Sequence, residues 1–178
     1  MDFQALEKIA LSCGFSCVGP LDASTIVLRH EVRDMCAANR CRMYGKNWSC
    51  PPGCGDLEKC RADVARYKSG VLVQTVGHLE DEFDGETMMA AEKEHKESFA
   101  RMYRELRKEY PGMLALGAGS CTRCKECTWP DAPCRFPEEM TSSMEAYGIM
   151  VYDICRDNGM KYSHGPLTIA YTSCFLLE

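Results

Sequence analysis

The sequence lacks several features that would assign a function directly. No run of eighteen apolar residues occurs, so no membrane-spanning helix is predicted. There is no Gly-x-Gly-x-x-Gly fingerprint and no Walker A motif, which removes the usual phosphate-binding loops of nucleotide enzymes. Radical-SAM enzymes need Cys-x3-Cys-x2-Cys. Cys50 and Cys54 provide the first spacing, but Leu57 occupies the position of the third cysteine.

The sequence also shows neither a net positive charge nor a recognisable secretory leader. The net charge is −5, so the chain as a whole is not expected to bind nucleic acid. The first residues, Met-Asp-Phe-Gln-Ala-Leu-Glu-Lys, are charged and contain no apolar signal-peptide core. We therefore expect a cytoplasmic protein, in a compartment where thiols stay reduced.

Cysteine is the residue that this sequence has in excess. The 178 residues include 13 cysteines, an odd number that cannot all pair within one chain. In a cytoplasmic protein such a number indicates metal ligands rather than a disulfide framework. Because no linker or internal repeat occurs, we expect residues 1–178 to form a single metal-binding domain.

The densest cysteine group lies between residues 121 and 137. Three cysteines follow one another at three-residue steps, and a fourth comes six residues after the third: Cys121, Cys124, Cys127 and Cys134. Ferredoxin-type loops that hold iron–sulfur clusters use this kind of spacing, with a proline soon after the last cysteine. Zinc sites more often present cysteines as separated pairs. The spacing favours a [4Fe–4S] cluster, with zinc as the alternative.

A second cysteine group lies in a long irregular stretch rich in glycine and proline. Such a stretch needs something other than a hydrophobic core to order it, and a metal would supply this. The second predicted ligand set is Cys36, Cys41, Cys50 and Cys54. Cys60 competes with Cys54 for the fourth position, although helical periodicity favours Cys60 as a packed helix residue. We expect Cys13, Cys17, Cys155 and Cys174 to be small core residues.

The remaining pattern predicts an α/β or α+β fold, with a mixed sheet of four or five strands flanked by helices and cysteine-rich metal-binding loops at one end. Apolar periodicity predicts helices over residues 3–13, 56–67, 84–110 and 142–158. It predicts strands over residues 15–21, 25–32, 71–76, 113–117 and 167–177. His95 lies on the apolar stripe of the longest helix, so we expect a hydrogen-bonded core histidine there.

Basic and aromatic residues surround both cysteine groups. Cations at these positions would offset the negative charge of the thiolates, or dock an acidic partner. The candidate cofactor-contacting residues are Tyr44, Lys46, Arg123 and Arg135.

Two blocks of the sequence resemble one family. They are Tyr44-Gly45-Lys46-Asn47-Trp48-Ser49-Cys50-Pro51-Pro52, preceded by Cys36 and Cys41, and the block from Cys121 to Pro137 followed by Glu145, Ala146 and Gly148. The chain is similar over nearly its whole length to a cysteine-rich "predicted metal-binding protein" family, domain of unknown function twenty-two eighty-four. The resemblance implies prokaryotic, anaerobe-associated metal binding and no established reaction.

The sequence thus predicts an iron–sulfur protein with two [4Fe–4S] clusters that exchanges electrons with a redox partner protein. Two alternatives remain open. One is a cluster- or corrinoid-dependent enzyme, in which Tyr44, Lys46, Trp48 and His164 would line the substrate pocket, although no acid–base pair or cofactor motif supports an enzyme. The other is a zinc-stabilised interaction module. The sequence does not decide whether the protein is an enzyme.

Overall fold

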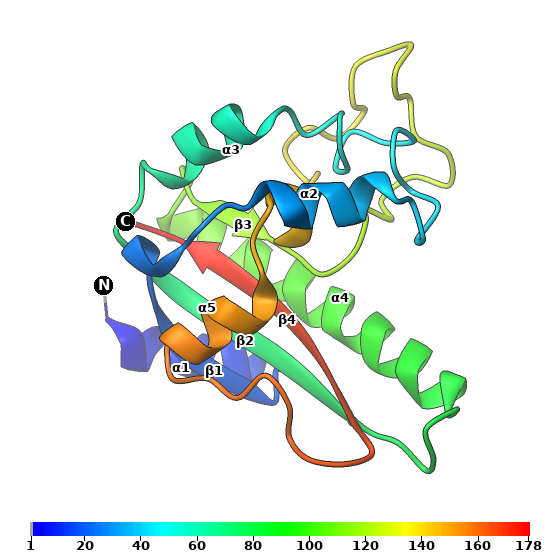
Figure 1. The fold of residues 1–178 in the computed structure, drawn as a ribbon. Coiled ribbons are helices and arrows are strands. Elements are labelled where there is room, and N and C mark those ends of the chain that lie inside the picture. The colour runs from blue at the N-terminus through cyan, green and yellow to red at the C-terminus, as the bar shows by residue number, and fades with distance from the viewer. Residues whose placement is uncertain (1) are drawn as a thin grey trace.

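The computed structural model describes residues 2–178 and is built around one four-stranded sheet (Figure 1). The strands are β1 (Cys17–Asp22), β2 (Ser69–His78), β3 (Leu114–Leu116) and β4 (Thr168–Leu176), in the spatial order β1-β2-β4-β3. All three strand pairs are antiparallel, so the fold is α+β and the expectation of a mixed sheet was wrong in this detail.

Five α-helices and two short 3₁₀ turns are attached to this sheet. They are α1 (Phe3–Ser12), α2 (His30–Ala37), α3 (Leu57–Val64), α4 (Gly85–Glu109), α5 (Val151–Asp157), η1 (Ala23–Thr25) and η2 (Glu145–Tyr147). The predicted starts of α3 and α4 are confirmed. The Asp56 carboxylate accepts a hydrogen bond from the amide of Lys59, and the Asp84 carboxylate accepts one from Thr87.

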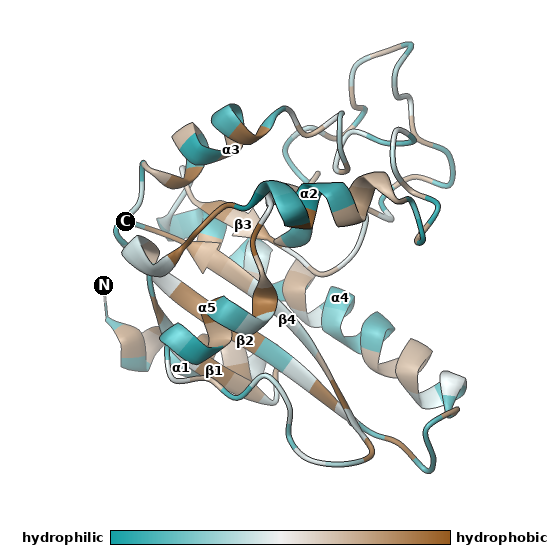
Figure 2. Ribbon diagram, in the orientation of Figure 1, coloured by the Kyte–Doolittle hydropathy of each residue, from teal (hydrophilic) through white to brown (hydrophobic). Residues whose placement is uncertain are grey.

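Both faces of the sheet are buried, because successive side chains of a strand point to opposite sides. Val71 and Val73 of β2 pack with α1 and α4, whereas Leu72 lies in the core formed with α3 and α5. Figure 2 shows the corresponding hydrophobic colour along the sheet and the hydrophilic colour on the outer faces of the helices. β2 is therefore a central strand, as its apolar sequence predicts.

Two predicted elements differ in the structure. Residues 25–32 do not form a strand; only Leu28 makes a β-bridge, to Ile149, and a helix begins at His30. Glu31 in the first turn suits the positive end of a helix better than a strand.

The predicted helix over residues 142–158 is divided in two, η2 and α5. Gly148 separates them with a left-handed φ of 83°. A side chain at this position would meet the Leu57 side chain at 2.8 Å and the Arg29 carbonyl at 3.0 Å, so both the left-handed φ and the close packing favour glycine at the break.

The two cysteine-rich segments lie side by side at one end of the molecule (Figure 1). One connects α2 to α3, and the other follows β3. No helix within residues 2–178 is long and apolar enough to cross a membrane.

Candidate metal centre

A buried hydroxyl joins the two cysteine loops. Ser49, in the first loop, is fully buried, and its Oγ accepts a hydrogen bond of 2.9 Å from the backbone amide of Cys121 in the second loop. The same hydroxyl donates to Oδ1 of the buried Asn47 at 2.7 Å. This chain of hydrogen bonds fixes the start of the second cysteine run against the first loop.

Two tryptophans form a second connection between the loops. The rings of Trp48 and Trp129 meet edge to face, with their centroids 4.6 Å apart. Each indole N–H donates across the contact at 3.1 Å, from Trp48 to the carbonyl of Ala132 and from Trp129 to the carbonyl of Gly45. We call this pair of rings and hydrogen bonds the tryptophan clasp.

The four cysteines of the second loop surround one small cavity. Cys121, Cys124, Cys127 and Cys134 line a space of about 30 Å³, together with Trp48, Ser49, Arg123, Phe136 and Met140. All four side chains are half-buried. Burial raises the pKa of the Cys121 thiol, and the three neighbouring cysteines raise it further by charge repulsion.

Three predicted ligands of the first loop also lie near one another: Cys36, Cys41 and Cys50. Burial raises the pKa values of Cys36 and Cys50, and the proximity of Cys41 raises both further. Cys50 also feels the charge of Cys121, so the two cysteine groups are adjacent. The structure therefore brings together in space what the sequence separates by about seventy residues.

The two candidates for the fourth ligand of this group lie together beneath Arg33. The guanidinium Nη1 of Arg33 is 4.0 Å from the Cys54 sulfur and 3.7 Å from the Cys60 sulfur. Arg33 is held in place by hydrogen bonds to the carbonyls of Ala146 (2.9 Å) and Gly55 (2.8 Å). The neighbouring Cys54 thiol and the positive charge of Arg33 together lower the pKa of Cys60.

The donor atoms at these positions are sulfurs, which suit soft or borderline metals and iron–sulfur clusters. Within residues 2–178, no group of three or more His, Cys, Asp or Glu side chains is arranged to hold a metal ion. The four cysteines of the second loop thus line one small cavity without converging on one point. A thiol must lose its proton to bind a metal, so the raised pKa values mean that binding would release protons.

Comparison with known proteins adds one decisive observation. The family model described as "Predicted metal-binding protein (DUF2284)" matches residues 19–177 of the 178-residue chain. The chain belongs to this family. No curated protein and no solved structure matches it.

The matched region of this DUF2284 protein contains both cysteine loops and the candidate cofactor-contacting residues. Tyr44 and Lys46 lie exposed on the first loop. Arg123 pairs with Glu139 at 2.7 Å and stacks over the Phe136 ring, and Arg135 donates to the Glu126 carbonyl at 2.8 Å. The last two cations are thus oriented by the second loop.

His164 and His95 both lie away from the cysteine loops. His164 faces Gln74 at 3.0 Å and lines a separate cavity beside β1, so it does not join Tyr44 and Trp48 around one pocket. His95 is a fully hydrogen-bonded core residue, as predicted. Cys13, Cys155 and Cys174 are buried as expected, whereas Cys17 is only half-buried.

Sequence reasoning missed the residues that join the loops. Nothing in the sequence distinguishes Ser49 from other serines, because its partner is 72 residues away. The two tryptophans are the only ones in the chain and each lies next to a proline or cysteine motif, which is the one signal that could have paired them.

Proposed function

We propose that this DUF2284 protein holds two [4Fe–4S] clusters and transfers single electrons to or from a partner protein. The observation that carries the proposal is the cavity surrounded by Cys121, Cys124, Cys127 and Cys134. The first three of these thiols have the Cys-x2-Cys-x2-Cys spacing of a ferredoxin-type loop, and all four share one half-buried space.

The second cluster would be held by the first loop, through Cys36, Cys41 and Cys50 with a fourth thiolate. Contact between Cys54 and Cys60 supports either of them as the fourth ligand. The adjacency of Cys50 and Cys121 supports two centres close enough to exchange electrons.

Cations beside the loops support a docking role. Four exposed basic side chains of this region form no ion pair within residues 2–178: Arg40, Arg42, Lys46 and Lys125. On a protein with net charge −5, such a local excess of positive charge suits an acidic redox partner. It also offsets the charge that deprotonated thiolates bring to a cluster.

The test is anaerobic purification followed by iron, sulfide and zinc analysis and an absorption spectrum. Two cubane clusters predict about eight irons and eight sulfides per chain, with broad brown visible absorption. Stoichiometric zinc without sulfide or colour would refute the proposal and leave a zinc-stabilised module.

Single substitutions then assign the ligands. Cys124→Ala should leave about four irons per chain, because only the second-loop cluster is lost. Cys17→Ala, which changes a half-buried cysteine on β1, is the matched control and should keep about eight. Full iron retention in Cys124→Ala would contradict the ligand assignment. Comparing Cys54→Ser with Cys60→Ser identifies the fourth ligand of the first loop, since only one of them should lose iron.

A further inference from the structure

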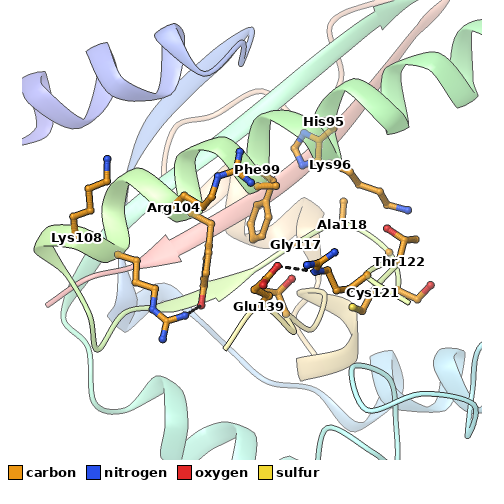
Figure 3. Close-up of a pocket in the computed structure, with 17 residues that line it drawn as sticks. His95, Lys96, Phe99, Arg104, Lys108, Gly117, Ala118, Cys121, Thr122 and Glu139 are labelled. Atoms are coloured by element: carbon orange, nitrogen blue, oxygen red, sulfur yellow. Dashed lines mark hydrogen bonds and ion pairs between the residues drawn. The ribbon is translucent and has the colours of Figure 1, made fainter. Parts of the chain in front are cut away.

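A large cavity lies beside the second cysteine loop, on the side that faces α4. Its volume is about 650 Å³, within the range of about 300–1,000 Å³ of small-molecule sites. Helix α4 forms one wall and residues 117–123 form the other (Figure 3), and Glu139 and Thr141 also line the cavity. Cys121 and Arg123 line both this cavity and the four-cysteine cavity.

The charge of the lining is strongly one-sided. Five cations line the cavity, against a single carboxylate, that of Glu139: Lys96, Arg104, Arg107, Lys108 and Arg123. Lys96, Arg107 and Lys108 have glutamate partners, Glu92, Glu138 and Glu105, none of which lines the cavity. Arg104, which also lies on α4, has no hydrogen bond or ion pair within residues 2–178 (Figure 3). A cleft lined by cations attracts an anion.

Backbone donors add to this positive character. The residues Ala118, Gly119 and Ser120 all line the cavity, and none of their amides has a hydrogen-bond partner within residues 2–178. Gly119 adopts a left-handed φ of 73°. Successive free amides in such a turn form concave sites that accept anions.

The floor of the cavity is apolar and rigid. Phe99 lines it, and its ring is stacked on Phe175 of the sheet with centroids 4.8 Å apart. Tyr103 is fixed by a 2.6 Å hydrogen bond from its hydroxyl to the Glu138 carbonyl, and Arg107 donates to the same oxygen. These contacts tie α4 to the segment after the cysteine loop, so the cavity does not depend on ligand to form.

We propose that this cavity binds a small organic anion, with an aromatic or otherwise apolar body against Phe99 and a phosphate or carboxylate group held by Arg104 and Lys108. The free amides lie beside Lys96, at the other end of the cavity, and would accept a second polar group of the ligand. The ligand would lie directly against the cysteine loop, through the shared Cys121 and Arg123. The proposal rests on the cavity alone and does not require that the clusters exist.

The test uses four probes in isothermal titration calorimetry on the anaerobically purified protein. They are 1-naphthyl phosphate, 1-naphthoate, neutral 1-naphthol and inorganic phosphate. At least one of the two aryl anions should bind at least tenfold more tightly than both naphthol and phosphate, and the tighter of the two identifies the anionic group. Equal binding of all four probes, or none at millimolar concentration, would overturn the proposal.

Variants place the binding in this cavity. Arg104→Gln and Lys108→Gln should each weaken aryl-anion binding about tenfold, the usual effect of losing one charge-assisted hydrogen bond. Arg66→Gln removes an exposed arginine that lies over a different aromatic ring, that of Tyr67, and should leave binding unchanged. Equal affinity in all three variants would refute the site. Iron analysis of the same preparations separates this result from the cluster proposal. An iron-free protein that binds the aryl anion would refute the cluster proposal and support the anion site.

Discussion

His95 is a buried base whose titration should control the stability of the protein in mild acid. Its side chain is only 1% exposed, and it lies between α4 and the sheet. Nδ1 is 3.0 Å from the Thr75 hydroxyl on β2, and Nε2 is 2.6 Å from the Ser173 hydroxyl on β4. Burial lowers the pKa of His95 from 6.5 to about 4, so the imidazole is neutral in the folded protein.

The sign and size of the effect follow from this difference. Below pH 6.5 the unfolded chain takes up a proton at His95 that the folded protein does not bind, so stability falls as the pH drops. The loss reaches about 2 kcal/mol at pH 5 and about 3 kcal/mol below pH 4, since one pKa unit is worth 1.36 kcal/mol. Above about pH 7.5 this contribution is constant.

Urea unfolding followed by circular dichroism at pH 8 and pH 5 measures the effect. In His95→Gln, which cannot titrate, the stability lost between the two pH values should be about 2 kcal/mol smaller than in the wild type. That corresponds to about 1 M in the difference of the urea midpoints. His78→Gln, at an exposed position on β2, is the matched control and should follow the wild type. Identical pH dependence in wild type and His95→Gln would refute the reasoning.

Three further predictions concern the two cysteine loops, α4 and the core. Trp129→Phe removes one donor of the tryptophan clasp, worth about 1 kcal/mol, and should speed metal release to a chelator several-fold; an unchanged rate would show that the clasp does not retain metal. Asp84→Ala removes the N-cap hydrogen bond to Thr87 and should lower the free energy of unfolding by about 1 kcal/mol in urea titration, whereas Asp81→Ala, a nearby non-capping aspartate, should cost less. Met102→Ala in the core between α4 and the sheet should cost about 2–5 kcal/mol, and a loss under 1 kcal/mol would mean that the site collapses around the change.

Helix starts and the central strand could be predicted from the sequence because the residues that specify them lie within a few positions of one another. Asp56 and Asp84 begin helices by accepting amide bonds three residues away. The run from Val71 to Val73 is apolar at every position, as a strand buried on both faces must be. The strand predicted over residues 25–32 was wrong for two reasons. Leu28 pairs only with Ile149, more than one hundred residues away, and Glu31 and Val32 belong to the helix that begins at His30.

The sequence by itself indicated metal binding for this DUF2284 protein: eight of its thirteen cysteines fall in two cysteine-rich segments, with the spacing of metal ligands and cations nearby. Only the tertiary structure decided how those groups meet. It joined the loops through Ser49 and Cys121, placed Cys54 and Cys60 together under Arg33, and formed a cationic cavity between α4 and the second loop. The physical reason is that spacing is a local property, whereas each of these contacts joins segments that approach only after the antiparallel sheet has brought them to one end of the molecule.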